Sequence, residues 1–403
     1  MSNEKTKQRE LELDTKALKN DQDKRVIPSG LDLKVRKKID QNKKKILKYL
    51  KANDEDYNNY EWQMQNRFDD IDKLKEVFNI DEKRLEEIKE ISKKYRWSIS
   101  PYYLSLLDLE NKNDPLSLMC IPSILEGETT GESDPMAEEY TNPAGSITRR
   151  YPDRLIINVT NSCGTYCRFC QRKRNIGERD SSTNLKEINE SIEYIKNNKY
   201  IRDVLITGGD PLTLSTKKLE DIIKRVRAIK HVEIIRLGTR IPITIPQRID
   251  KELVKMLKKY HPLYINLHFN HPKEITKESV KACSFLADAG IPLGNQTVLL
   301  KGINNNKYVM LKLCQELLKA RVKPYYIFQA KKVKGTLHFV CEIKEGIEIV
   351  NFLRGNTSGL AIPSYIVNSP NGLGKVNLAK KNYEFLENGK IKLTTWEGKE
   401  LIY

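Results

Sequence analysis

Three cysteines lie close together near the middle of the chain. Cys163, Cys167 and Cys170 have the spacing C-x3-C-x2-C, whereas four others are scattered: Cys120, Cys283, Cys314 and Cys341. An odd total with one tight cluster favours metal binding over disulfide pairing. A structural zinc ion takes four protein ligands, and none of the five histidines is near this cluster in the sequence. Three thiolates on a four-iron cubane would leave one iron open to a small molecule. The alternatives are three buried cysteines without a chemical role, or a zinc ion with a distant fourth ligand.

The elements around the cysteines predict an α/β fold. From residue 154 on, short β-rich runs alternate with amphipathic stretches. We expect strands at residues 155–160, 204–207, 232–237, 264–269, 292–300 and 324–329, and helices at 216–229, 250–260, 273–289 and 308–320. This alternation predicts a parallel sheet of βα units. Six units are too few for a closed eight-stranded barrel, so we expect a partial (β/α)6 barrel with ligands at the C-terminal ends of its strands.

The rest of the chain divides by composition into further regions. Residues 1–45 form a charged N-terminal extension that we expect to be mobile or helical. Residues 46–148 form a helical region, in which 81–94 carry apolar residues at Leu85, Ile88 and Ile91. Residues 124–148 are rich in Gly, Glu, Thr and Pro and predict an irregular connection. We assign 149–360 to the barrel and 361–403 to a C-terminal segment.

The charge and the hydropathy limit the partners of the protein. The formal net charge is +17, which suits either an anionic partner or a lysine-rich solvated surface. The lysines are spread along the whole chain without an aromatic-interleaved basic stripe, so we favour the solvated surface and expect no nucleic-acid partner. No long apolar run and no secretory signal is present, so we expect no membrane contact and a cytoplasmic location.

A glycine-rich segment follows the second expected strand. Gly208, Gly209 and Asp210 come directly after residues 204–207, although a Gly-Gly-Asp sequence alone is usually a turn. Together with the cysteine spacing and Phe169 before the last cysteine, the segment resembles the radical S-adenosylmethionine enzymes. In that family a 4Fe-4S cluster with one open iron binds S-adenosylmethionine and cleaves it to a 5′-deoxyadenosyl radical. The resemblance implies that the glycine-rich segment contacts the methionine end of this cofactor.

Further segments narrow the resemblance to the lysine 2,3-aminomutase family. Matching stretches lie at residues 150–154, 163–174, 267–272, 294–296 and 353–359. The resemblance extends from about residue 45 to the end, and the first 45 residues lie outside it. It implies an isomerase that moves an amino group between Cα and Cβ of an amino acid with the help of pyridoxal 5′-phosphate.

The resemblance assigns cofactor residues by position. Lys375, on a glycine-rich turn, matches the lysine that binds pyridoxal phosphate covalently, and an amine is the right nucleophile once deprotonated. Arg150, Tyr151 and Arg154 match the residues that hold the phosphate, a group that arginine forks suit. Without the resemblance, each of these would be an ordinary surface residue.

Other matching positions concern the substrate backbone and the adenosyl group. Arg172 matches the arginine that binds the substrate α-carboxylate, and its basic neighbours Arg168, Lys173 and Arg174 leave a generic basic loop as the alternative. His268 and Gln296 match positions near the adenosyl group. A single histidine at a strand end is often only a structural hydrogen-bonding group.

Two positions depart from the pattern of the lysine enzyme. That enzyme recognises the ε-ammonium of lysine with two aspartates, and this chain has Lys331 and Asn368 there. A cationic substrate would meet like charge at Lys331, whereas a distal carboxylate would gain a charge-assisted hydrogen bond. The same pair is typical of the glutamate 2,3-aminomutase branch, so we predict conversion of L-glutamate to β-glutamate. Lys332 lies beside Lys331, so one of the two could simply face solvent.

The remaining expectations concern metals, partners and rival functions. The zinc-binding cysteine tail of the lysine enzyme is absent, and Asn306 replaces its partner cysteine, so we expect no zinc. We expect a homo-oligomer that receives electrons from a reductase or a flavodoxin- or ferredoxin-type donor. The alternatives are an aminomutase for lysine or another amino acid, an RNA-modifying radical enzyme, and a purely structural iron–sulfur protein.

Overall fold

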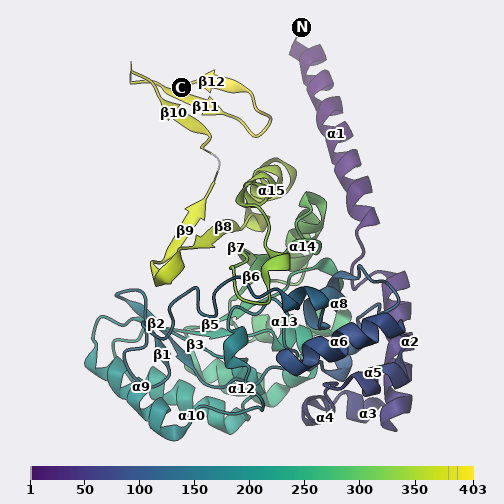
Figure 1. Cartoon of the computed structure of the whole chain (residues 1–403). Coiled ribbons are helices and arrows are strands. Elements are labelled where there is room, and N and C mark those ends of the chain that lie inside the picture. The colour runs from purple at the N-terminus through teal and green to yellow at the C-terminus, as the bar shows by residue number, and fades with distance from the viewer. Residues whose placement is uncertain (1, 380, 388) are drawn as a thin grey trace.

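The computed structural model describes residues 2–379, 381–387 and 389–403, and a nine-stranded sheet forms its centre (Figure 1). Seven strands are parallel and follow one another in chain order: β2 (Arg154–Asn158), β3 (Asp203–Thr207), β4 (Ile234–Gly238), β5 (Leu263–Leu267), β6 (Leu293–Leu299), β7 (Lys323–Gln329) and β8 (Ser364–Asn368). Antiparallel edge strands flank them, β1 (Ile147–Thr148) and β9 (Lys375–Leu378). Within the described residues β1 and β9 do not pair, so the barrel stays open, as predicted.

Helices connect the parallel strands as the alternating pattern predicts. They are α9 (Leu185–Asn197), α10 (Thr216–Arg227), α12 (Lys251–Leu257), α13 (Lys277–Asp288), α14 (Lys307–Lys319) and α15 (Ile343–Asn356). In α10 the residues that face the sheet, Leu219, Ile222, Ile223 and Val226, recur at helical spacing and are buried. All six expected strands are present within one or two residues of their expected ends, which confirms the βα reading.

The seventh parallel strand, β8, is not among the strands expected from the sequence. Its five residues stand between Pro363 and the turn that starts at Pro370, and only Tyr365 and Ile366 of them are buried. A run of five residues is too short for its hydrophobic periodicity to identify it as a strand. The division of the chain at residues 45, 148 and 360 stays a prediction, and in the structure β8 and β9 of the last region join the sheet.

The N-terminal region is helical, as expected. It contains α1 (Ser2–Val26), α2 (Leu33–Leu50), α3 (Asp54–Tyr57), α4 (Tyr60–Gln65), α5 (Ile71–Val77), α6 (Glu82–Lys94), α7 (Pro101–Ser105) and α8 (Pro115–Cys120). The predicted residues Leu85, Ile88 and Ile91 are buried in α6. In Figure 1 the N-terminal end of α1 projects from the body of the molecule, whereas its C-terminal end contacts α14, where Lys24 donates to Gln315. Within the described residues, no helix combines the length and the apolar character that crossing a membrane requires.

A small second sheet lies at the C-terminal end, formed by β10 (Tyr383–Phe385), β11 (Ile391–Thr394) and β12 (Glu400–Ile402). The turn between β11 and β12 connects this sheet with α1, because Glu397 accepts a hydrogen bond of 2.8 Å from Arg9 and one of 2.8 Å from Lys16. Trp396 of the same turn lies against Gly355 so closely that a Cβ there would be 1.9 Å from the ring. The two ends of the chain therefore meet on one side of the barrel.

Candidate active site

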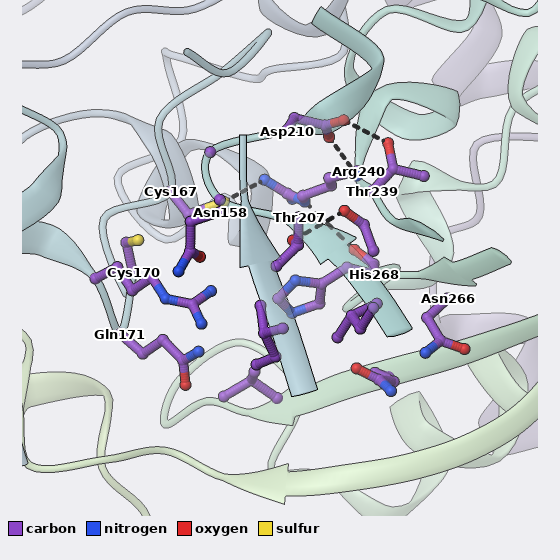
Figure 2. A pocket seen from close by; sticks show the side chains of 18 of the residues that line it. Asn158, Cys167, Cys170, Gln171, Thr207, Asp210, Thr239, Arg240, Asn266 and His268 are labelled. Atoms are coloured by element: carbon purple, nitrogen blue, oxygen red, sulfur yellow. Dashed lines mark hydrogen bonds between the residues drawn. The ribbon is translucent and has the colours of Figure 1, made fainter. Parts of the chain in front are cut away.

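One cavity of about 440 Å³ opens at the C-terminal ends of the parallel strands. All residues that the sequence analysis proposed for a site line it: Arg150, Tyr151, Arg154, Cys163, Cys167, Cys170, Arg172, Gly208, Gly209, Asp210, His268, Gln296, Lys331, Asn368 and Lys375. Parallel strands bring their carboxyl ends to the same edge, so loops distant in the sequence meet there. Figure 2 shows one part of this cavity.

The cysteines lie on the loop after β2, which is fastened to the N-terminal region. The amide of Tyr166 donates to the carbonyl of Ser98 over 2.9 Å, and the amide of Arg168 donates to the carbonyl of Met119 over 2.8 Å. Burial raises the pKa of all three thiols, and a bound metal would supply the charge that deprotonates them. All three cysteines line the cavity from one loop. Three thiolates that leave one iron open to a ligand are the donor set such a cluster would take.

Arg240, in the loop after β4, contacts this cysteine loop directly. Its Nη1 donates a hydrogen bond to Sγ of Cys167 over 2.9 Å, as Figure 2 shows, and its Nη2 donates to the hydroxyl of Tyr103 over 2.9 Å. The same guanidinium forms an ion pair with the buried carboxylate of Glu274. Arg240 is not recognisable from the sequence, because nothing in its neighbourhood distinguishes it from the other arginines of the chain.

The Gly-Gly-Asp segment packs against the start of the cysteine loop. Gly208 has φ +132°, and a Cβ there would lie 2.5 Å from the carbonyl oxygen of Thr160. The amide of Asp210 donates to the carbonyl of Ser162 over 2.7 Å. Two glycines are therefore needed to let β3 end this close to the cysteine loop.

The carboxylate of Asp210 holds the loop after β4. It accepts hydrogen bonds from Thr239 Oγ1 at 2.7 Å, from the amide of Arg240 at 2.6 Å and from the amide of Ile241 at 3.1 Å. Burial raises its pKa to about 6, although these hydrogen bonds act in the opposite direction. Asp210 thus orients the segment that carries Arg240.

His268, after β5, presents an unpaired polar atom. Burial, together with the charge of Arg240, lowers the pKa of its ring to about 3, so the imidazole is neutral. Its Nε2 is buried and has no hydrogen-bond partner among the described residues. The ring stands edge-on to Phe169, with centroids 5.7 Å apart. A buried nitrogen without a partner at a cavity wall is suited to a ligand.

Lys375 begins β9, and its register partner is Asn368 of β8. Although the residue as a whole is exposed, its amine lies 5.6 Å from the ring centroid of Tyr151 and 5.9 Å from that of Phe328. Partial desolvation by these surroundings, with the charges of nearby arginines, lowers the pKa of Lys375 to about 8. The neutral, nucleophilic form of the amine is therefore more accessible near neutral pH than for an ordinary lysine.

Arginines gather beside this amine. The guanidinium of Arg154 stacks on the ring of Tyr151 at 3.6 Å and donates to Asp153 over 2.8 Å. Arg236 of β4 also lines the cavity and donates to Asp203 over 2.8 Å. Arg236 was not selected from the sequence, because it lies inside a strand and far from the other basic residues of the site.

Arg172 and Arg150 share one carboxylate, that of Glu138. Arg172 donates to it from Nε and from Nη2, each over 2.9 Å, and Arg150 donates from Nη2 over 3.2 Å. Burial alone would raise the pKa of Glu138, but Arg172 and Arg150 lower it. Glu138 lies in the connection predicted to be irregular, where the sequence offered no signal for it.

The basic neighbours of Arg172 have other functions. Arg168 and Lys173 are buried and bind Glu126, and Arg174 binds Asp134 over 2.9 Å. Of the four cations of this loop, all within the described residues, Arg172 is the one whose side chain lines the cavity. Arg172 is therefore the cation of this segment that the cavity could present to a ligand.

Lys331, after β7, lines the same cavity and lies close enough to Arg172 and Arg150 to be influenced by their charges. Its ammonium donates a hydrogen bond to Oε1 of Gln171, which follows Cys170 directly. Burial, with the charges of Arg172 and Arg150, lowers the pKa of Lys331 to about 7, whereas Glu138 acts in the opposite direction. Lys332 is exposed, so of the two neighbouring lysines Lys331 is the one in the cavity.

The open parallel sheet, with a cysteine triad and a Gly-Gly-Asp segment at its strand ends, defines the class of radical S-adenosylmethionine proteins. A family model described as "Radical SAM superfamily" matches residues 157–314. A crystal structure of Streptococcus suis SuiB bound to S-adenosylmethionine is similar at a TM-score of 0.36 and 16% identity, over 51% of this chain and 43% of that chain. That likeness is too distant to carry an argument about the site.

Curated relatives specify the family further. Glutamate 2,3-aminomutase of Clostridioides difficile (strain 630) is 55% identical over 401 residues, which cover 98% of this chain and 94% of that protein. L-lysine 2,3-aminomutase of Acetoanaerobium sticklandii is 47% identical over 85% of this chain and 84% of that protein. L-lysine 2,3-aminomutase of Bacillus subtilis (strain 168) is 41% identical over 86% of this chain and 74% of that protein. This chain belongs to the amino acid 2,3-aminomutase family, whose members are isomerases.

The extent of these similarities corrects one expectation. The first 45 residues were expected to lie outside the resemblance, but the similarity to the Clostridioides difficile protein covers 98% of the chain and so includes most of them. The similarities to the two lysine enzymes cover 85% and 86% of it. Charged helix surfaces such as that of α1 tolerate many substitutions. The similarity of such a helix to the same helix in a relative is therefore hard to recognise from composition.

Proposed function

We propose that this protein is a glutamate 2,3-aminomutase, which interconverts L-glutamate and β-glutamate. The observation that carries the proposal is the polarity of the subsite formed by Lys331 and Asn368. A cation and an amide line the part of the cavity where the lysine enzyme has two carboxylates. An ammonium placed there would be repelled, whereas a carboxylate would be paired and hydrogen-bonded. The 55% identity to a glutamate 2,3-aminomutase supports the same substrate.

The proposal assigns three bound groups to the cavity. Cys163, Cys167 and Cys170 would hold a 4Fe-4S cluster, and the unpaired Nε2 of His268 supports a ligand such as the adenosyl group beside it. Gly208 and Gln296 also line the cavity and would contact other parts of S-adenosylmethionine. When bound, the cluster and S-adenosylmethionine supply a radical that removes hydrogen from the substrate, and pyridoxal phosphate carries the migrating amino group.

The chain's own residues explain how pyridoxal phosphate would be held. Lys375 matches the lysine that binds this cofactor in the family, and its lowered pKa suits covalent attachment of the aldehyde. Arg150 and Arg154, with Tyr151 between them in sequence, supply guanidinium groups for a phosphate dianion. We also propose that the protein needs no zinc, works as a homo-oligomer and receives electrons from a flavodoxin- or ferredoxin-type donor or a reductase.

The two ends of glutamate would be fixed by different elements. Arg172, from the cysteine loop, would bind the α-carboxylate, and Lys331 with Asn368 would bind the distal carboxylate. Because Asn368 pairs with Lys375 in the register of β8 and β9, the distal subsite lies beside the covalent attachment point. Two fixed ends restrict the reacting carbons to one orientation, which a radical reaction needs in order to avoid side reactions.

The test is a product assay on anaerobically reconstituted protein. It receives S-adenosylmethionine, pyridoxal phosphate and dithionite, with L-glutamate or L-lysine in separate reactions. We expect β-glutamate from glutamate and little β-lysine from lysine. β-Lysine as the main product would overturn the substrate but keep the family. Tight, salt-sensitive RNA binding without any β-amino acid would favour an RNA-modifying enzyme instead.

A further inference from the structure

We infer that Gln171 is a specificity-determining residue, which holds the Lys331 ammonium in place for a substrate carboxylate without neutralising its charge. The inference rests on the proposed function, because it concerns the subsite that would bind the distal carboxylate of glutamate. Gln171 lies between Cys170 and Arg172 in the sequence, and its side chain lines the cavity beside Cys170 (Figure 2).

The contact joins two loops that are distant in the sequence. Nζ of Lys331, from the loop after β7, donates to Oε1 of Gln171, from the loop after β2. The side chain of lysine is long and flexible, and without an acceptor its ammonium would have no fixed position. The amide of Gln171 therefore selects one position of the ammonium inside the cavity.

The neutrality of this acceptor distinguishes Lys331 from its basic neighbours. Arg172 and Arg150 both bind the carboxylate of Glu138. Lys331 forms no ion pair with a carboxylate of the described chain, although Glu138 is close enough to influence its pKa. The ammonium of Lys331 is thus oriented by a neutral acceptor, whereas an anionic ligand of Arg172 or Arg150 would share its cation with Glu138.

The amide can also serve the ligand itself. Its Oε1 accepts from Lys331, while the NH2 group of the same amide can donate two hydrogen bonds. A carboxylate bound to Lys331 would need such donors for its second oxygen. A carboxylate at position 171 would instead pair with Lys331 and repel an anionic substrate.

The variant Gln171→Glu tests the inference, because it changes the charge and almost nothing of the shape. Glutamate binding is followed by the change in absorbance of bound pyridoxal phosphate, without reductant, so that the redox state of the cluster does not enter the measurement. We expect the apparent Kd and the KM for glutamate to rise at least about tenfold. The new carboxylate would compete with the substrate carboxylate for Lys331, and such competition in a desolvated site usually has an effect of this order. An unchanged Kd and KM would overturn the inference.

Two further variants make the result specific. Gln41→Glu adds the same charge on the exposed face of α2 and should leave the Kd unchanged. Gln171→Met removes the acceptor and the donors without adding charge, and it should raise the Kd by a smaller factor. If Gln171→Glu loses its iron, Gln171→Met decides: an unchanged Kd overturns the inference.

The product formed by the wild-type protein separates failure of the inference about Gln171 from failure of the proposed function. A wild-type protein that makes no β-glutamate would overturn both. A wild-type protein that makes β-glutamate, with Gln171 variants that bind glutamate equally well, would overturn the inference alone.

Discussion

Nη1 of Arg240 lies 2.9 Å from Sγ of Cys167 and donates a hydrogen bond to it. Reduction of a cluster on this thiolate would add negative charge, which a neighbouring guanidinium stabilises. Arg240→Lys keeps a cation for Glu274, but one ammonium cannot also reproduce the fork that reaches Cys167. We therefore expect a more negative midpoint potential for the cluster, measured by redox titration with electron paramagnetic resonance.

A second buried arginine provides the control for this prediction. Arg248 donates to the carbonyls of Leu212 and Leu214, over 3.0 and 3.1 Å, and does not contact a cysteine. Arg248→Lys should leave the potential unchanged. Equal potentials in wild type and Arg240→Lys, at equal iron content, would contradict a tuning function of Arg240.

Gly208 should tolerate no side chain. Alanine there would place a Cβ 2.5 Å from the carbonyl oxygen of Thr160, at a φ of +132°. Overpacking and backbone strain together should lower the free energy of unfolding by about 2 kcal/mol or more, seen as a lower melting temperature and lower iron content. Gly359→Ala, where nothing lies within 4 Å of the added Cβ, should behave like wild type. Similar melting temperatures for both variants would contradict the close approach.

The sequence predicted the residues that follow strands better than those that lie in irregular connections. The cysteines and Gly208 follow apolar β-rich runs and His268 lies at the end of another, and these positions place them at one edge of a parallel sheet. Glu138 lies in a stretch with no periodic pattern, and its partners Arg172 and Arg150 come from two other loops. Only the packed chain brings these three together.

The juxtaposition of Lys375 with Asn368 was also beyond the sequence. It depends on β8 and β9 pairing antiparallel at the edge of the sheet, and β8 is too short to be assigned from its period. The match to a known family supplied both residues individually. The register shows that they are neighbours, which is what the proposed geometry requires.

Glutamate binding should weaken as the pH rises above 7. The pKa of Lys331 is lowered to about 7 by burial and by Arg172, Arg150 and Lys375, with Glu138 opposing them. A substrate carboxylate binds the ammonium form, so affinity is full below this pKa and falls above it. The loss approaches about tenfold per pH unit until the pKa of the bound state is reached.

The variant Lys331→Arg gives this pH dependence its control. A guanidinium stays charged over the whole range, so the apparent Kd of this variant should not rise with pH on either side of 7. The measurement is a titration of the holoenzyme with glutamate at several pH values. The same slope in both proteins would show that another group titrates.

Glu126 should be important for stability rather than for substrate binding. It is fully buried and binds two buried cations, Arg168 and Lys173. Glu126→Gln would leave both cations without a counter-charge, and we expect a loss of about 3–5 kcal/mol in the free energy of unfolding by urea. Glu233→Gln breaks an exposed pair with Arg202 and should change stability little. A small loss at position 126 would contradict the importance of this buried ion cluster.

The charge-reversed double variant Lys331→Asp with Asn368→Asp tests the proposed substrate recognition most directly. Two carboxylates in the distal subsite should repel the carboxylate of glutamate and attract the ammonium of lysine. From competition reactions with equal L-glutamate and L-lysine, we expect the wild type to form mainly β-glutamate and the variant mainly β-lysine. The preference should change by roughly 30-fold or more, as expected for about 2 kcal/mol in a desolvated charge contact. A variant that still prefers glutamate would contradict the assignment of Lys331 and Asn368 as the residues that select the substrate.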